Sequence, residues 1–311
     1  MKARGRYAPT PSGDLHLGNA RTALLAWLSI RAQGGEFVLR MEDLDKPREQ
    51  PGAAARILDS LRWLGLDWDE GPDVGGPHGS YVQSERSGLY DDAVTTLVAV
   101  GKAFPCWCSR AEVAAASRAP HAGEEGPRYP GTCRTADPGA MALRGRPPSM
   151  RVRAPEGPIR FVDRLQGPQA FDVDALTGDF VIRRADGVAS YQLAVAVDDA
   201  AMGITEVLRG DDLLSSTPRQ LIVYEALSLV APSFFHVPLV LGPDGGRLAK
   251  RNGARSIGEL REAGEDPKAI CGLLAALSGL AEPGERVSPR ELIARWDPER
   301  LPREPVRLVG G

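Results

Sequence analysis

The first 64 residues alternate between short apolar runs and longer segments with helical periodicity. A strand is predicted over 6–8 and a proline-rich turn over 9–13. Beyond the turn, apolar side chains recur at helical spacing at Leu17, Ala20, Leu24, Trp27 and Leu28. A second strand over 36–41 and a second helix over 53–64 follow. This order is typical of parallel sheets, so we predict an α/β fold with a Rossmann-type, doubly wound parallel sheet.

The pattern breaks down in 104–148, which is rich in cysteine, proline and polar turns, and we interpret this segment as an inserted subdomain. Strands are then predicted over 150–153, 159–163, 179–184, 204–208 and 236–241, and we expect them to complete the sheet. Helices are predicted over 191–202, 218–230, 268–280 and 289–296. The expected organisation is a catalytic-type domain in two halves (1–103 and 149–256), the insertion (104–148) and a short helical C-terminal region (257–311).

Composition limits the protein class. The chain has 311 residues, 42% of them hydrophobic and 25% charged, which fits a folded globular protein. It contains neither an apolar run of membrane-spanning length nor a signal-peptide pattern, so we expect a cytoplasmic protein without membrane contact. Because the net charge is −3, nucleic acid would have to contact local basic runs, for which 144–153 and 250–255 are candidates. The first run is equally explained as a solvated surface, whereas the second coincides with a signature described below.

A proline-fixed turn and His16 directly precede the first predicted helix. Free backbone N–H groups and the positive end of the helix dipole favour an anion there, and Gly18 permits close approach of a nucleotide. His16 would then donate a hydrogen bond to a phosphate that gains charge during reaction. The alternative is a capped helix with an incidental histidine.

Three segments resemble signatures of class I aminoacyl-tRNA synthetases of the glutamyl and glutaminyl group. Residues 6–19 are similar to the His-Ile-Gly-His motif, with Asn19 in place of the second histidine. Residues 246–251 are similar to the Lys-Met-Ser-Lys-Ser loop, with Lys250 as the matching lysine and with Arg247 and Ala249 as departures. The block over 203–220, which contains Arg-Gly-Asp-Asp and Ser-Thr-Pro-Arg-Gln, is the most specific match.

This resemblance implies ATP with Mg²⁺ and L-glutamate as substrates. It assigns His16 and Lys250 to catalysis, and ATP binding to His16, Gly18, Asn19 and Lys250. It also implies a glutamate site in which Glu42 binds the ammonium, Arg6 and Arg209 bind carboxylate, Thr10 and Tyr191 supply hydroxyls, and Tyr7, Ala8 and Pro9 complete the lining. Two arginines favour glutamate over glutamine, because an amide would leave guanidinium groups without a charged partner.

The predicted insertion contains a candidate metal site. Cys106 and Cys108 supply two thiolates at i and i+2, and Cys133 lies beyond a loop, a spacing that can close a tetrahedral zinc site. Ordinary free cysteines are the alternative. The run Tyr129 to Cys133 resembles the Tyr-x-Gly-x-Cys motif of the short glutamyl-queuosine tRNA(Asp) synthetases, which implies a structural zinc ion with Tyr129 as fourth ligand. Cys271, in an apolar helical run, is predicted to be a core residue.

The acceptor follows from the length after the second signature. Residues 257–311 are expected to be too few for an anticodon-binding domain. The short glutamyl-queuosine family, which transfers glutamate to queuosine in the anticodon of tRNA(Asp), fits this length, and we expect a monomer with this tRNA as partner. Two alternatives remain: a glutamyl-tRNA synthetase fragment that charges the tRNA 3′ end with its anticodon domain encoded elsewhere, and a tRNA-binding protein that has lost catalysis.

Overall fold

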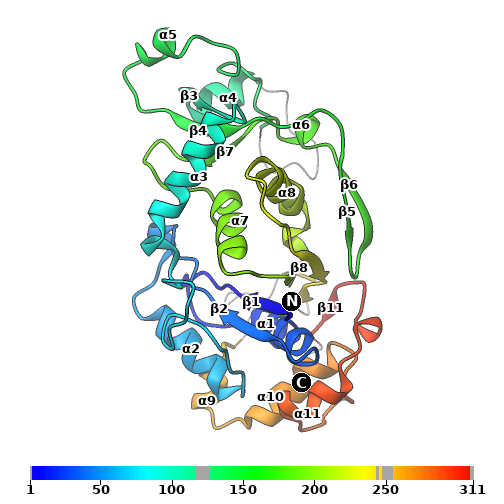
Figure 1. Cartoon of the computed structure of the whole chain (residues 1–311). Helices are drawn as coiled ribbons and strands as arrows, with labels where there is room; N and C mark the ends of the chain where they lie inside the picture. The colour runs from blue at the N-terminus through cyan, green and yellow to red at the C-terminus, as the bar shows by residue number, and fades with distance from the viewer. Residues whose placement is uncertain (1, 117–126, 243–244, 247–254, 309–311) are drawn as a thin grey trace.

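A four-stranded parallel sheet forms the centre of the fold (Figure 1). The computed structural model describes residues 2–116, 127–242, 245–246 and 255–308. The sheet has the order β2-β1-β8-β9, with β1 (Arg4–Tyr7), β2 (Glu36–Leu39), β8 (Glu206–Gly210) and β9 (Ser233–Val237). Helix α1 (Leu17–Arg31) connects β1 to β2, and α8 (Thr217–Ala226) connects β8 to β9. The strand order therefore reverses between β1 and β8.

Helices cover both faces of this sheet, as the doubly wound fold requires. Along β2, Phe37 and Leu39 pack in one core, and Val38 packs in the other. Val207 and Leu208 of β8 divide in the same way. Helices α1 and α10 (Pro267–Ala276) build the first core, and α7 (Tyr191–Ala201) and α8 build the second. Because both faces are buried, β2 is apolar from Phe37 to Leu39 without alternation.

Three of the predicted strands do not join the parallel sheet, which corrects the sequence analysis. β4 (Ser149–Val152) pairs antiparallel with both β3 (Ala103–Cys106) and β7 (Phe180–Arg183). β5 (Ile159–Asp163) pairs only with β6 (Gly167–Phe171), in an antiparallel hairpin at the side of the molecule (Figure 1). Strands with one exposed face alternate between polar and apolar residues, as antiparallel sheets permit, whereas strands of a parallel sheet are usually buried on both faces. The four predicted domain limits stay a prediction.

Several predicted elements have different limits. The α-helices predicted over 268–280 and 289–296 end at Ala276 and Leu292. The helix predicted over 218–230 ends at Ala226, because Ser228 adopts a left-handed backbone with φ of 55°. The strand predicted over 236–241 divides around Pro238, which has no N–H to donate to a sheet. Its second part is β10 (Val240–Leu241), which pairs in parallel with β11 (Val306–Arg307).

The remaining helices surround the two cores. Helices α3 to α6 were not predicted, whereas α2 matches its prediction within one residue. Their bounds are α2 (Ala53–Trp63), α3 (Ser87–Ala99), α4 (Arg110–Ala116), α5 (Pro138–Ala142) and α6 (Val173–Leu176). The C-terminal helices α9 (Ile257–Glu262), α10 and α11 (Pro289–Leu292) lie below α1 in Figure 1. Across the described part of the chain, no helix has the length and apolarity to cross a membrane.

Candidate active site

Two buried arginines lie where the strand order of the parallel sheet reverses. Arg6 is near the carboxyl end of β1 and Arg209 is near that of β8, and both are 4% exposed. Open α/β sheets bind ligands beyond the carboxyl ends of their strands at such a reversal. A buried guanidinium is costly unless it is paired, so the partners of these two side chains define the site.

Carboxylates hold Arg6 and the neighbouring Arg40 in place. Oδ1 of Asp199, on α7, accepts hydrogen bonds from Nε of Arg6 at 3.3 Å and from Nη1 of Arg40 at 2.8 Å. Arg40 also donates from Nη2 to Oε1 of Glu42 at 3.0 Å. Burial alone would lower the pKa of Arg40, but Asp199, Asp198 and Glu42 together raise that pKa well above its ordinary value. Arg40 therefore stays cationic and fixes Glu42.

Glu42 is the carboxylate that has the fewest partners in this network. It is 8% exposed, and hydrogen bonds to its side chain within the described chain reach only Oε1. Burial raises the pKa of Glu42, and the cations of Arg40 and Arg6 offset part of this rise. Its backbone N–H donates to the carbonyl of Pro9 at 2.9 Å, which ties it to the segment after β1. A ligand ammonium beside Glu42 would favour its charged form.

Arg209 is held through a histidine rather than through a carboxylate. Its Nε lies 2.9 Å from Nε2 of His236, on β9, and its Nη2 donates to Oγ1 of Thr217 at 2.8 Å. Its Nη1 is buried and has no hydrogen-bond partner among the described residues. Burial lowers the pKa of Arg209. Other arginines of the described chain also have a buried nitrogen without a hydrogen-bond partner. Arg209 differs because it lies at the reversal of the sheet, where open α/β sheets bind ligands, so its Nη1 is a candidate contact for an anion.

Tyr191 lies near Arg209, Glu42 and Arg6. It begins α7, where the hydroxyl of Ser190 caps the helix. Burial raises the pKa of the Tyr191 hydroxyl, and Arg209, Glu42 and Arg6 are all close enough to act on it. The structure thus brings together four residues that the sequence singled out separately.

The other predicted glutamate-binding residues lie along the segment that leaves β1. Tyr7 packs in the first core, on the face opposite Arg6, because side chains alternate along a strand. A ligand contact by Tyr7 would therefore come from its backbone, and its carbonyl already accepts from the N–H of Arg40 at 3.1 Å. Ala8 and Pro9 are half-buried and Thr10 is exposed.

His16 occupies the N-cap position of α1 and makes no capping hydrogen bond with its side chain. Its Nδ1 is buried and lacks a hydrogen-bond partner within the described ranges. A side chain added at Gly18 would meet Cβ of Val240 only at 4.0 Å, an ordinary contact, so packing within the described chain does not require glycine there. Asn19 is exposed.

The second signature lies outside the described residues, and this includes Lys250, Arg247 and Ala249. The described residues on either side of it lie beside the first signature. Ser256 forms an isolated antiparallel bridge with His16, and the N–H of Ile257 donates to the carbonyl of Leu15 at 2.8 Å. Before the signature, Val240 faces Gly18. The described residues Val240 and Ser256, which precede and follow the signature, thus lie near the start of α1.

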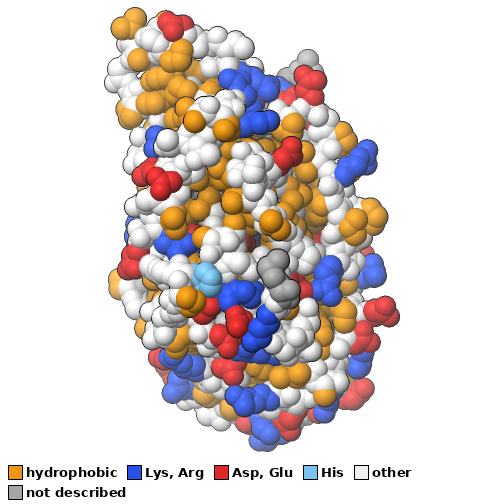
Figure 2. Space-filling model, in the orientation of Figure 1, with side chains coloured by type: hydrophobic (Ala, Val, Ile, Leu, Met, Phe, Trp, Pro, Cys, Tyr) orange, Lys and Arg blue, Asp and Glu red, His pale blue; other side chains and the backbone are white. Residues whose placement is uncertain are grey.

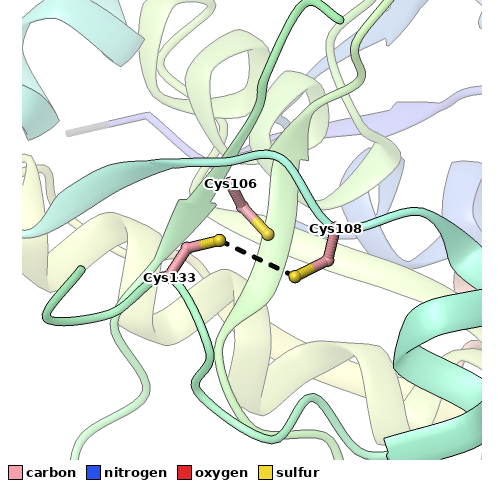
Figure 3. A group of neighbouring side chains, drawn as sticks. All are labelled: Cys106, Cys108 and Cys133. Atoms are coloured by element: carbon pink, nitrogen blue, oxygen red, sulfur yellow. Dashed lines mark hydrogen bonds between the residues drawn. The ribbon is translucent and has the colours of Figure 1, made fainter. Parts of the chain in front are cut away.

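Three cysteines meet at the carboxyl end of β3, where their side chains point toward one another (Figure 3). The sulfur atoms of Cys106, Cys108 and Cys133 all lie within 4.8 Å of one another. Sγ of Cys108 and Sγ of Cys133 are 3.6 Å apart, far longer than the roughly 2.0 Å of a disulfide. With Zn–S distances of about 2.3 Å, a tetrahedral site separates its sulfur atoms by about 3.8 Å. The cluster therefore has the spacing to hold a metal ion.

Tyr129 joins this cluster as the sequence predicted. Its hydroxyl lies 3.3 Å from Sγ of Cys106 and accepts from the N–H of Cys133 at 2.8 Å. The guanidinium of Arg151 stacks over its ring at 3.9 Å. Burial raises the pKa of the Cys106 thiol, but Tyr129 and Arg151 outweigh this effect and lower it overall. Cys271 lies apart, buried in the first core as predicted.

The basic run 144–153 is explained by packing. Arg144 and Arg146 both pair with Glu112. Arg153 stacks over Phe104 at 4.8 Å, as Arg151 does over Tyr129. On the face shown in Figure 2, positive and negative groups are mixed in the lower half. Of the second basic run, only Arg255 belongs to the described residues, and it lies 3.6 Å from Glu265.

Sequence reasoning gave no role to five residues of the site. Thr217 lies inside the 203–220 block, Asp199 lies in the helix predicted over 191–202, and Arg40 lies two positions before Glu42. His236 and Tyr224 had no such signal. The Tyr224 hydroxyl is buried without a hydrogen-bond partner in the described structure, and burial raises its pKa beside Asp199. Such residues are found only when tertiary contacts are known.

The fold and these residues define a class of protein, which comparisons with known proteins identify. A family model described as "tRNA synthetases class I (E and Q), catalytic domain" matches residues 2–301. The chain belongs to this family and is a ligase of the aminoacyl-tRNA synthetase type. The α/β fold and the family resemblance predicted from the sequence are confirmed.

Individual relatives narrow the comparison. A glutamyl-Q tRNA(Asp) synthetase from Symbiobacterium thermophilum is 58% identical over 308 residues, which cover 98% of this chain and 95% of that protein. Glutamate–tRNA ligase 1 from Halorhodospira halophila is 48% identical, over 99% of this chain but 65% of the ligase. The crystal structure of a glutamate tRNA ligase from Elizabethkingia meningosepticum in complex with its amino acid has a TM-score of 0.86 at 30% identity, over 99% of this chain and 67% of that one.

Proposed function

We propose that the protein activates L-glutamate with ATP and transfers the glutamyl group to queuosine in the anticodon of tRNA(Asp). The observation that carries the amino-acid assignment is the pairing of two buried groups. One is Arg209, whose Nη1 no described residue contacts by a hydrogen bond, and the other is Glu42, whose pKa burial raises. Together they offer a cation and an anion to one small ligand.

Glutamate matches these groups chemically, because it has one ammonium and two carboxylates. Glu42 would bind the ammonium, while Arg6 and Arg209 would bind carboxylate oxygens, with the Tyr191 hydroxyl beside them. Thr10 would close the outer side. Glutamine would leave a buried guanidinium without a charged partner. A site that is built to bind a charged group strongly rejects analogues without that group.

ATP would bind at the start of α1, at His16, Gly18 and Asn19. Val240 and Ser256, which precede and follow the second signature, lie near this point. The glutamate α-carboxylate attacks the α-phosphorus of ATP, an acyl–phosphate bond forms, and pyrophosphate leaves. This nucleophile is already anionic, so the step needs no general base. His16 would donate to the phosphate, and Lys250 would follow the charge that moves to pyrophosphate. Mg²⁺ bound with ATP would neutralise part of the charge on the phosphates.

In the second step a hydroxyl of the acceptor attacks the acyl carbon and AMP leaves. The assignment of this acceptor to queuosine rests on relatives named glutamyl-Q tRNA(Asp) synthetase, which are 58% and 47% identical and match at 95% and 94% of their own lengths. We expect the protein to work as a cytoplasmic monomer with this tRNA. Glutamyl transfer to a tRNA 3′ end is the second candidate, favoured by the identity to glutamate–tRNA ligases.

Glutamate-dependent exchange of pyrophosphate into ATP tests the activation step. The protein is expected to catalyse this exchange with glutamate and not with glutamine or aspartate. If folded protein shows no exchange, with or without tRNA, the result would favour the other alternative, a tRNA-binding protein that has lost catalysis.

We propose that the cluster of Cys106, Cys108, Tyr129 and Cys133 holds one structural zinc ion. The three sulfur atoms and the Tyr129 oxygen supply the four donors that a closed site requires. Bound metal would join β3 to the segment that contains Tyr129 and Cys133, in addition to the small apolar cluster that these segments share.

Loss of this metal should destabilise the protein without removing its catalytic groups. Purified protein is expected to contain one zinc ion per chain by elemental analysis. Cys108→Ser should lose the metal and lower Tm by roughly 5 °C or more, since structural zinc contributes directly to folding free energy. Cys271→Ala is the matched control, because that thiol lies in the apolar core; it should keep the metal. Full zinc retention in Cys108→Ser would contradict the proposed site.

Glu42→Gln tests the ammonium contact. The amide keeps the size of the side chain but removes its charge, so KM for glutamate should rise roughly 30-fold, the equivalent of about 2 kcal/mol for a charged hydrogen bond. Steady-state exchange kinetics measure this change. Glu156→Gln, at an exposed position, is the control. Equal KM values for Glu42→Gln and the control would remove Glu42 from the glutamate site.

A further inference from the structure

We infer that His236 is a positioning residue, which acts as a neutral hydrogen-bond acceptor and aims Arg209 at the amino-acid carboxylate. The inference rests on the proposed function, since it takes glutamate as the ligand of Arg209. It adds a residue and a protonation state that the sequence motifs do not contain.

Asp163 fixes the orientation of the imidazole. Its Oδ2 lies 2.6 Å from Nδ1 of His236. Backbone N–H groups of Leu165, Gln166 and His236 also donate to this carboxylate, at 3.0, 2.9 and 3.1 Å, so it is held as an acceptor. Nδ1 must therefore carry the hydrogen, because a carboxylate surrounded by donors has none to give. His236 and Asp163 are 0% and 1% exposed, which excludes bulk water from the contact.

This tautomer determines what the other ring nitrogen does. With hydrogen on Nδ1, Nε2 presents a lone pair, and Nε–H of Arg209 points to it at 2.9 Å. A hydrogen on Nε2 would oppose that N–H group, and an imidazolium would place a second cation beside Arg209. The groups that face the ring are Asp163, Arg209, Thr217 and, at longer range, Arg6. Burial lowers the pKa of His236 despite Asp163, which agrees with a neutral ring.

The contact decides which part of Arg209 remains for a ligand. His236 occupies Nε, and Thr217 occupies Nη2 at 2.8 Å. The guanidinium plane is thereby fixed, and Nη1 is the nitrogen for which no partner exists in the described chain. The β5–β6 hairpin positions this carboxylate, because Asp163 is the last residue of β5 and contacts His236 from outside the parallel sheet.

Kinetics of His236 variants test the inference. His236→Leu removes the acceptor, so KM for glutamate should rise about 10- to 100-fold, while KM for ATP should change less than about threefold. His236→Gln can place an amide oxygen near the position of Nε2, and it should restore KM for glutamate to within about fivefold of the wild-type value. Thermal unfolding confirms that each variant is folded.

A double-mutant cycle separates positioning from general support of the fold. If His236 acts through Arg209, then adding His236→Leu to Arg209→Met should raise KM by less than about threefold, whereas independent effects would multiply. Multiplying effects, or a folded His236→Leu protein with wild-type KM, would overturn the inference. If His236→Leu does not fold, His236→Gln decides: a rise in KM as large as that of Arg209→Met contradicts it. Wild-type protein that shows no glutamate-dependent exchange would instead refute the proposed function.

Discussion

Replacing Arg209 with methionine is expected to reduce kcat/KM for glutamate-dependent pyrophosphate exchange by about 300-fold. The guanidinium is buried, and Nη1 has no hydrogen-bond partner among the described residues. The proposed partner of Nη1 is the glutamate carboxylate. Loss of one member of a buried charge pair costs about 3 kcal/mol or more, which corresponds to at least roughly two orders of magnitude. Most of the change should appear in KM for glutamate, because this contact exists before reaction as well as during it.

Arg160→Met is the matched control for this prediction. Arg160 is exposed on β5, so its replacement should leave exchange kinetics unchanged. Comparison of thermal unfolding of the two variants shows whether Arg209→Met remains folded. A folded Arg209→Met protein with the control's KM for glutamate would exclude Arg209 from the amino-acid site, and the glutamate assignment would lose its main support.

Lys250→Ala is expected to lower kcat for adenylate formation by about 10³-fold while glutamate binding changes little. Lys250 matches the lysine of the second signature and would compensate charge on the departing pyrophosphate, which develops only during reaction. Removal of one such group typically lowers kcat by about 10²- to 10³-fold. Single-turnover formation of glutamyl-adenylate measures the rate, and calorimetry measures the dissociation constant of glutamate.

Lys268→Ala provides the control, because Lys268 lies on α10 and pairs at the surface with Glu291. Turnover of Lys250→Ala equal to that of the control would remove Lys250 from the mechanism. A loss of glutamate affinity as large as the loss of rate would show that the lysine supports the pocket rather than the reaction.

The beginning of the fold was predictable because its signals are local. The β1-α1-β2 order follows from a strand, a proline-fixed turn and a helix with regular apolar spacing, and two glycines separate α1 from β2. The partners of β4, β5 and β7 were not predictable in this way. Their short runs alternate like strands of many sheets. Their pairing depends on contacts across more than forty residues of chain, as between Cys106 and Ser149.

The site residues likewise differ in whether a local sequence signal or only a tertiary contact reveals them. Arg6, Glu42 and Arg209 were proposed from the sequence through the family resemblance, and the structure brings them together. The groups that orient them were missed. Asp199 and His236 act only through tertiary hydrogen bonds, and a single sequence does not reveal that a histidine 27 positions after Arg209 will lie 2.9 Å from it.

The position of the transferred glutamate on tRNA tests the proposed activity most directly. The protein is incubated with ATP, labelled glutamate and tRNA(Asp) that carries queuosine, and the product is digested with nucleases. We expect label on the anticodon nucleotide that contains queuosine, and none on the same tRNA with unmodified guanosine at that place. Label on the 3′-terminal adenosine would contradict the proposed acceptor and identify the protein as a tRNA-charging ligase.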